Sequence, residues 1–262
     1  MNINQLKAIV VFDIDGVVRD VSGSYRKAIA DTVEKFTDGL FRPTMADIDE
    51  LKSEGIWNND WQASQELVYR YLESQGKSRE TIDLSYDAIV DFFQRRYRGN
   101  NPDLFDGYIA REPLLMSMDY LQHLTQNNVG WGFFSGATRG SAEYILRQRL
   151  RLQNPVLVAM EDAPGKPNPQ GLFDVVRQIK HSEGIIPVIY VGDTVADMQT
   201  IIAAKKEQEK TNWIGVGVLP PHVQTDRPRQ AKYRDKLIAS GAKIVLDNVE
   251  KLNFQVISSL LE

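Results

Sequence analysis

Short apolar runs rich in β-branched residues recur along the chain, separated by longer stretches with helical periodicity. The runs cover residues 8–12, 129–134, 155–160, 186–191, 213–218 and 243–246. Runs of this length predict strands buried on both faces, as in a parallel sheet. Helical patterns at 140–150, 170–181, 195–206, 230–240 and 250–261 supply the crossovers. The alternation predicts an α/β fold with a doubly wound, Rossmann-like parallel sheet.

Between the first two predicted strands, the chain loses this alternation and becomes helical. Apolar residues such as Ala28, Ile29 and Val33 share one helical face there. We therefore expect a core of residues 1–20 and 105–262, with a helical domain of residues 21–104 inserted after the first strand. Such an insertion begins at the carboxyl end of the strand, where ligands bind in open α/β sheets. Residues 219–234 are expected to form a loop.

Composition narrows the choice of partners and compartment. The 262 residues carry a net charge of −4 and no cysteine, which excludes disulfides, thiolate metal sites and a cysteine nucleophile. No basic excess favours nucleic acid, and no run of about 18 apolar residues predicts a membrane span. The apolar run at 8–12 is too short for a signal sequence. We expect a cytoplasmic protein without nucleic-acid or membrane partners; its oligomeric state is not predicted.

Two carboxylates close the first predicted strand. Asp13 should lie at the edge of the sheet, and Gly16 allows a sharp turn on which Asp15 can project. An isolated Asp-Gly pair is most often a turn or a helix cap. A calcium loop needs further oxygen ligands, which Val17 and Val18 do not supply. Asp13 and Asp15 alone therefore do not indicate a functional site; further residues that would lie at the same place are needed.

A second acidic pair closes the strand predicted at 186–191. Asp193 should lie at the strand end, and Asp197 should project from the first turn of the next helix toward the same loop. Alone, this pair is a common strand-to-helix turn. Together with Asp13 and Asp15, it creates a concentration of negative charge that a hard divalent cation with oxygen ligands would neutralise. The sequence thus predicts a Mg²⁺ site.

Two further elements suit a phosphate group. Ser135 and Gly136 end the strand at 129–134 and offer a hydroxyl and a backbone amide, although a capping serine would look the same. Lys166 lies in a proline-containing loop before a helix, where a single lysine is most often solvated. This loop is not a Walker motif, because Pro167 replaces the required Ser or Thr.

In order and in strand context, these residues resemble the four motifs of the haloacid dehalogenase (HAD) superfamily. The resemblance covers residues 7–20 and 105–250, and the helical insertion resembles the C1 cap of subfamily I. Residues 165–169 resemble subfamily IA phosphatases of the phosphoglycolate phosphatase branch. The motifs are carried by Asp13, Asp15 and Gly16, by Ser135, by Lys166, and by Gly192, Asp193, Thr194 and Asp197.

The resemblance implies a hydrolase that transfers a phosphoryl group through an aspartyl-phosphate. Asp13 would be the nucleophile, and Asp15 the general acid for the leaving alcohol and then the base for water. Ser135 and Lys166 would hold the transferring oxygens. Dehalogenases have no acid at the position of Asp15, because halide leaves without a proton, so Asp15 favours phosphate chemistry.

The resemblance also implies how Mg²⁺ is held. Asp13, Asp193 and the backbone carbonyl of Asp15 would bind the ion directly or through water. Asp197 would support the site, either at the metal or by orienting Lys166.

Several residues are candidates for reading the substrate. In the helical insertion, Trp57, Asn58 and Asn59 are polar or aromatic, although Trp57 equally suits packing within the helices. In the core, the candidates for substrate binding are Gly136, Thr138 and Arg139, which follow Ser135. Arg139 equally suits an exposed helix start.

The sequence therefore predicts a Mg²⁺-dependent phosphatase acting on a small phosphorylated metabolite. A phosphomutase of a sugar phosphate on the same fold is the first alternative, and a non-catalytic binding protein is the second.

Overall fold

The computed structural model describes residues 6–57, 59–101, 104–180 and 184–262. The chain divides into two compact units, Met1–Asp20 with Leu114–Glu262, and Val21–Pro113. The first is called the core unit and the second the helical unit. Within the described residues, no helix is long and apolar enough to cross a bilayer.

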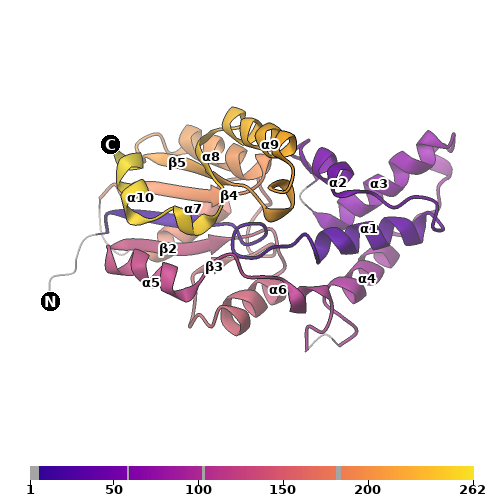
Figure 1. Ribbon diagram of the computed structural model, residues 1–262, viewed down its shortest axis with the longest axis horizontal. Helices are drawn as coiled ribbons and strands as arrows, with labels where there is room; N and C mark the ends of the chain where they lie inside the picture. The colour runs from indigo at the N-terminus through magenta and orange to yellow at the C-terminus, as the bar shows by residue number, and fades with distance from the viewer. Residues whose placement is uncertain (1–5, 58, 102–103, 181–183) are drawn as a thin grey trace. The chain divides into compact units, whose positions relative to one another are not determined.

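A parallel sheet forms the centre of the core unit (Figure 1). In the described residues it has six strands in the order β3-β2-β1-β4-β5-β6, and each neighbouring pair is parallel. The predicted doubly wound α/β fold is confirmed. The strands are β1 (Ala8–Phe12), β2 (Val129–Phe134), β3 (Leu157–Val158), β4 (Val188–Gly192), β5 (Trp213–Val218) and β6 (Ala242–Leu246).

The order of strands reverses between β1 and β4. The chain moves outward from β1 through β2 to β3, then returns to the other side of β1 as β4 and continues to β6. Phe12, the last residue of β1, is in register with Phe133 of β2 and Val191 of β4. The residues that follow these three strands therefore meet at one switch point, the usual ligand site of such sheets.

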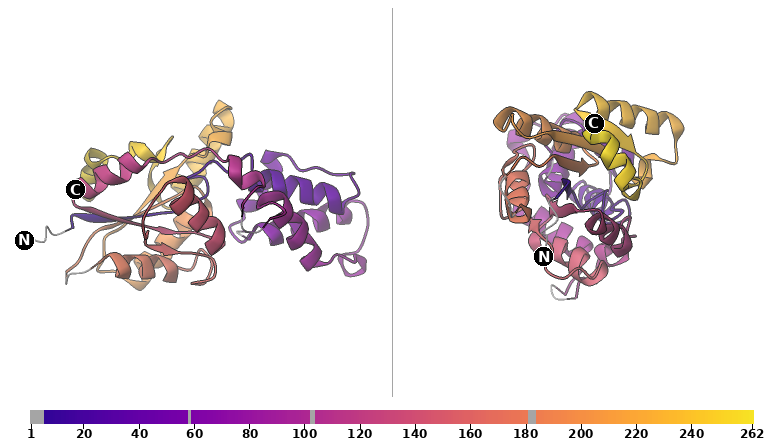
Figure 2. Two further views of the ribbon diagram at one scale, coloured as in Figure 1. Left: turned by 90° about the horizontal axis from the view of Figure 1, so that it is seen from below. Right: turned by 90° about the vertical axis from the view of Figure 1, so that its left-hand side faces the viewer.

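Helices cover both faces of the sheet, as Figure 2 shows for α5 and α10 on one face and α7 on the other. One apolar cluster joins α7 and α8 to residues such as Val11 and Tyr190 on the strands. On the opposite face, the ring of Phe12 lies edge-on to Tyr120 of α5. The core helices are α5 (Met118–Gln126), α6 (Arg139–Glu143), α7 (Gln170–Ile179), α8 (Val195–Glu207), α9 (Arg227–Ala239) and α10 (Phe254–Leu261).

Several segments differ from the predicted elements; the helix expected at 250–261, for example, begins only at Phe254, after a 3-10 turn over Val249–Lys251. β3 has two residues instead of six, because beyond it the amide of Ala159 donates to the Asp162 side chain. The helix expected at 140–150 starts as α6 and continues as a π-helix over Tyr144–Arg149. The loop expected at 219–234 is wrong over its second half, since α9 begins at Arg227. Proline in the first turn of α9 fits there because the amides of that turn need no intrahelical acceptor.

The helical unit consists of four α-helices within its described residues. They are α1 (Tyr25–Phe36), α2 (Met45–Lys52), α3 (Asp60–Ser74) and α4 (Tyr86–Tyr97). α1 packs against both α3 and α4, and it buries Ala28, Ile29 and Val33, the face that the periodicity predicts. Side-chain caps fix several helix starts; Asn59, for example, accepts from the amides of Trp61 and Gln62 at α3.

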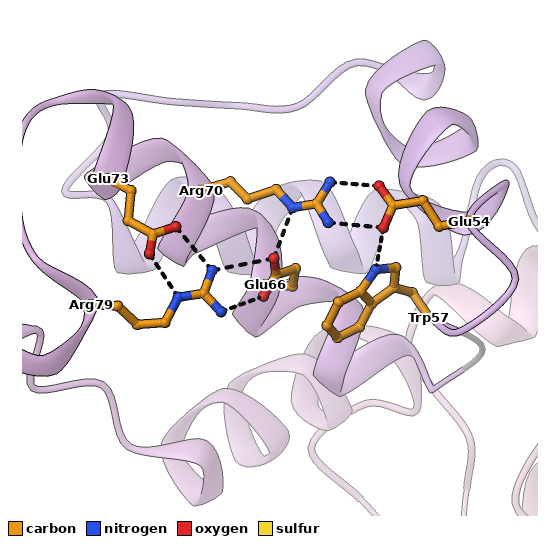
Figure 3. Close-up of polar contacts among 6 residues, drawn as sticks. All are labelled: Glu54, Trp57, Glu66, Arg70, Glu73 and Arg79. Atoms are coloured by element: carbon orange, nitrogen blue, oxygen red, sulfur yellow. Dashed lines mark hydrogen bonds and ion pairs between the residues drawn. The ribbon is translucent and has the colours of Figure 1, made fainter.

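A chain of ion pairs links α3 to the loops on either side of it (Figure 3). Arg70 donates to Glu54 at 2.7 and 2.9 Å and to Glu66 at 2.8 Å. Arg79 donates to Glu66 at 3.0 and 3.2 Å and also binds Glu73. The side chain of Glu66 is only 9% exposed, so it is the shielded centre of this network. The hydrogen bonds from Arg70 lower the pKa of Glu54 to about 2.

We expect Glu66→Gln to lower the free energy of unfolding by about 1–2 kcal/mol, because two arginines lose their shared, shielded carboxylate. Asp91→Asn is the matched control in the same unit. Its pair with Arg95 has the same i, i+4 spacing as Glu66 and Arg70, but its side chains are 58% and 63% exposed. Urea denaturation should show a loss below about 0.5 kcal/mol for the control. Equal losses in the two variants would contradict a special role for Glu66.

Candidate active site

Three buried carboxylates meet at the switch point of the sheet. Asp13 follows β1, Asp193 follows β4, and Asp197 lies in the first turn of α8. Each offers a carboxylate oxygen within 4.8 Å of the others. The amide of Asp13 donates to the carbonyl of Val191 at 2.8 Å, which ties the end of β1 to β4. The first and fourth motifs therefore form one site.

Glycine at position 16 lets the two acidic loops approach each other. Gly16 has a φ of +75°, which L side chains rarely adopt, and a Cβ added there would lie 2.1 Å from Oδ2 of Asp193. Gly192 has a related role, because its added Cβ would lie 2.3 Å from Cβ and Cγ of Asp197. The sequence places glycine where the backbone must pass close to a carboxylate.

Both oxygens of Asp197 are bonded within the protein. Oδ2 accepts from the hydroxyl of Thr194 at 2.6 Å and from its amide at 3.0 Å, in a capping box that starts α8. Oδ1 accepts from the hydroxyl of Tyr190 at 2.8 Å and pairs with Nζ of Lys166 at 2.7 Å. These bonds make Asp197 the residue that orients Lys166.

Lys166 lies at the centre of this arrangement, not in solvent. Its side chain is 4% exposed, and Nζ lies 2.8 Å from Oδ1 of Asp13. The ammonium also lies 5.3 Å from the centroid of the Phe134 ring and 5.5 Å from that of the Tyr190 ring. Two aromatic faces and two carboxylates thus fix one cation beside Asp13.

Burial and charge together set the ionisation of the cluster. Burial raises the pKa of Asp13 to about 7, although the Lys166 ammonium opposes the rise. Burial acts on Asp197 in the same direction, but Lys166 and the bonds from Thr194 and Tyr190 outweigh it and lower the pKa of Asp197. Burial opposes the charge of Lys166, yet Asp13 and Asp197 raise its pKa above the ordinary value. Of Asp13 and Asp197, Asp13 is therefore the carboxylate with less compensating positive charge.

Asp15 is bound by an arginine from its own loop. Nε of Arg19 donates to Oδ1 of Asp15 at 2.7 Å, and Nη2 lies 2.6 Å from the same oxygen. The Arg19 side chain is fully buried, whereas that of Asp15 is 24% exposed. The contact fixes the side-chain direction of Asp15 in this structure.

Comparison with known proteins agrees with the geometry. Residues 7–205 match the model of the haloacid dehalogenase-like hydrolases. The chain belongs to this family of hydrolases. The predicted membership in the HAD superfamily, and the prediction of an enzyme, are confirmed.

One curated relative and two solved structures extend this comparison. A protein of Phytophthora nicotianae named imidazoleglycerol-phosphate dehydratase is 31% identical over 214 residues, 81% of this chain. The chain spans 43% of that relative's length. A phosphonoacetaldehyde hydrolase-like protein from Oleispira antarctica has a TM-score of 0.68 and 18% identity, covering 98% of this chain and 93% of its own. A family IA HAD hydrolase from Entamoeba histolytica has a TM-score of 0.61 and 10% identity, covering 98% and 99%. At these identities, the solved structures show a shared fold.

The residues around the second HAD motif lie on the loop after β2. Ser135 is buried, and its Oγ accepts from the amide of Ala137 at 3.1 Å. Gly136 is exposed, with open space around the position of a Cβ. The hydroxyl of Thr138 donates to that of Ser141 at 3.0 Å. Arg139 pairs with Asp162 and lies 3.4 Å from Glu143, so its guanidinium already has carboxylate partners.

The candidates in the helical unit have local partners as well. Nε1 of Trp57 donates to Glu54 at 2.7 Å, as Figure 3 shows. Asn59 caps α3, and Asn58 lies outside the described residues. Their assignment to the substrate stays a prediction.

Sequence reasoning missed Tyr190, Phe134 and Arg19. The two aromatic residues lie within apolar strand runs, where a ring is expected in the core. Arg19 follows Asp15 by four residues, which is a spacing that allows an ion pair but does not require one. Which residues these three side chains contact depends on how the strands and loops pack, and the sequence pattern does not record that.

We expect the ionised Asp13 to destabilise the metal-free fold. Its pKa is higher in the folded state, about 7 against 3.8, so stability is lost as the pH rises through this interval. Asp13→Asn should therefore raise the melting temperature in EDTA more at pH 8 than at pH 5. The gain in the free energy of unfolding should be larger at pH 8 than at pH 5 by on the order of 2 kcal/mol, since one pKa unit corresponds to ~1.4 kcal/mol.

Thermal unfolding at both pH values measures this difference. Asp91→Asn removes an exposed carboxylate and should give the same small change at pH 5 and pH 8. An effect of Asp13→Asn that does not depend on pH would contradict the assigned shift.

Proposed function

We propose that this HAD hydrolase is a Mg²⁺-dependent phosphatase that hydrolyses a small phosphate monoester through an aspartyl-phosphate. The observation that carries the proposal is the buried Asp13 carboxylate, which lies at a strand end with Lys166 at 2.8 Å and Asp193 in the same cluster. A nucleophile, a fixed cation and a second acid in one place are the parts that phosphoryl transfer requires.

The transfer uses Asp13, Lys166 and Ser135. The Asp13 carboxylate attacks phosphorus in line, and the bond from phosphorus to the ester oxygen breaks as that oxygen takes a proton from Asp15 and leaves as the alcohol. The Lys166 ammonium is held beside Asp13 and stabilises charge on the transferring oxygens. The Ser135 hydroxyl follows the neighbouring strand β2 and can donate to the same group. Water then attacks the aspartyl-phosphate, releases inorganic phosphate and restores the carboxylate.

Asp15 is the proton donor to the leaving oxygen and then the base that activates water. Its carboxylate is bound by Arg19, and the arginine stays charged at all working pH values. Both nitrogens of Arg19 contact Oδ1, so Oδ2 is the oxygen that would carry the proton to the leaving group. The Asp15 side chain is 24% exposed, which leaves it accessible to the leaving oxygen and to water.

The donor set of the cluster fits Mg²⁺. Asp13 and Asp193 supply carboxylate oxygens, the donor type that this ion prefers, and the high pKa of Asp13 indicates that positive charge is lacking there. The backbone carbonyl of Asp15 is the third proposed ligand. Asp197 supports the site through Lys166, since its oxygens bond to Thr194, Tyr190 and Lys166. When bound, Mg²⁺ would offset the negative charge of the phosphoryl oxygens.

Substrate recognition is proposed for residues outside this cluster. Gly136, Thr138 and Arg139 would contact the phosphate or a second anionic group. Trp57, Asn58 and Asn59 of the helical unit would read the leaving group. The cytoplasm is the proposed compartment.

An imidazole-bearing phosphate monoester is the first substrate to test. The curated relative is named for an enzyme acting on imidazoleglycerol phosphate, which is itself such an ester. This chain matches less than half of that relative, so we propose only the substrate class as a candidate and do not propose the dehydration.

A sugar phosphomutase would use the same residues with a substrate hydroxyl as the acceptor. A mutase gives an isomerised sugar phosphate, whereas a phosphatase gives inorganic phosphate, so product analysis separates them. A non-catalytic protein would give neither product.

Asp13→Asn should lower phosphate release from p-nitrophenyl phosphate at least about a thousandfold, because the amide cannot form the phosphoenzyme. The assay measures phosphate with Mg²⁺ and after its removal by EDTA, and wild-type turnover should require the ion. A panel of phosphate esters, including imidazoleglycerol phosphate, then ranks kcat/KM.

Asp174→Asn is the matched control. Asp174 lies on α7 and bonds to Gln170 and Arg177. The phosphatase activity of the Asp174→Asn variant should equal that of the wild type. Unchanged turnover in Asp13→Asn would exclude the proposed nucleophile.

A further inference from the structure

We propose that Tyr190 is a positioning residue of the active site, whose hydroxyl fixes Asp197 and, through it, holds the Lys166 ammonium at Asp13. The inference rests on the proposed function, because the consequence concerns phosphoryl transfer. Tyr190 lies in β4, is fully buried and belongs to neither acidic pair.

The hydroxyl of Tyr190 completes the bonding of one carboxylate oxygen. It donates to Oδ1 of Asp197 at 2.8 Å, and the same oxygen lies 2.7 Å from Nζ of Lys166. Thr194 binds the other oxygen with its amide and its hydroxyl. The carboxylate is therefore held from both ends, and its plane determines where the ammonium lies.

The ring of Tyr190 also forms one wall around the ammonium. Nζ of Lys166 lies 5.5 Å from its centroid and 5.3 Å from that of Phe134, and the two ring centroids are 6.2 Å apart. Gly171 leaves room for the Phe134 ring, since a Cβ there would lie 2.2 Å from it. One side chain thus provides both a hydrogen bond to the orienting acid and an aromatic face for the cation.

Charge makes this positioning matter. Lys166 is shared between Asp13 and Asp197, at 2.8 and 2.7 Å, and these two carboxylates compete for it. Burial and the Asp197 carboxylate raise the pKa of Tyr190 well above its ordinary value, so the hydroxyl stays protonated as a donor. Without this donor, the Asp197 carboxylate is held only from the Thr194 side, and Oδ1 keeps Lys166 as its single strong partner, so the ammonium shifts toward Asp197 and away from Asp13. The nucleophile then loses its fixed cation, and the ammonium is misplaced for the transferring oxygens.

The kinetic test is Tyr190→Phe, which keeps the ring and removes only the hydroxyl. We expect kcat to fall about tenfold with KM changed less than about twofold. Inhibition by orthovanadate, which mimics the five-coordinate transition state, should weaken by the same factor as kcat/KM, while inhibition by inorganic phosphate should not.

Tyr120→Phe is the matched control. Tyr120 is a buried tyrosine of the core unit, and its hydroxyl donates to the carbonyl of Leu252 at 3.0 Å. This variant should lose stability without a change in kcat or in orthovanadate inhibition. Equal kinetic losses in both variants, or none in Tyr190→Phe, would overturn the proposal.

A second measurement needs no catalytic activity. Tyr190→Phe, Lys166→Met and the double variant form a cycle of unfolding free energies by urea denaturation. We expect the loss from Tyr190→Phe to differ at least about twofold between the wild-type and Lys166→Met backgrounds, and additive losses would overturn the proposal. If the wild type hydrolyses no phosphate ester, the proposed function fails, whereas this cycle still decides whether Tyr190 acts on Lys166.

Discussion

The concentration of negative charge at the end of β1 and β4 is the constraint on which the rest of the site depends. Three carboxylates lie within 4.8 Å of one another in a buried place, where like charges are costly to keep ionised. One ammonium, from Lys166, offsets part of this charge. The remaining deficit of positive charge accords with the raised pKa of Asp13, and a divalent cation would offset it.

The fold supplies this arrangement through backbone geometry more than through side chains. β1 and β4 are adjacent parallel strands in register, so the residues after them leave the sheet together. Gly16 and Gly192 then allow the two loops to approach distances that any Cβ would prevent. One oxygen of Asp197 belongs to the capping box that starts α8, and the other pairs with Lys166. The same side chain therefore stabilises the helix start and holds the lysine of the site.

Much of the core could be predicted because its signals are local. Buried parallel strands appear as continuous apolar runs, and three of them, Ala8–Phe12, Val129–Phe134 and Trp213–Val218, have the bounds that the pattern predicts. The ends of strands and helices were less predictable. β3 is short and α9 starts early because side-chain bonds and first-turn proline chemistry decide such ends, and hydrophobic periodicity does not record them.

The sequence alone determined the alternating architecture, the helical insertion and the identity of the acids, since these depend on pattern, spacing and motif order. Only the tertiary structure shows which partners these acids have. Asp197 pairs with Lys166, Arg19 binds Asp15, and the rings of Tyr190 and Phe134 lie against the ammonium. These contacts join residues from different strands and loops, and their distances follow from how β1, β2 and β4 are packed, which a linear sequence does not specify.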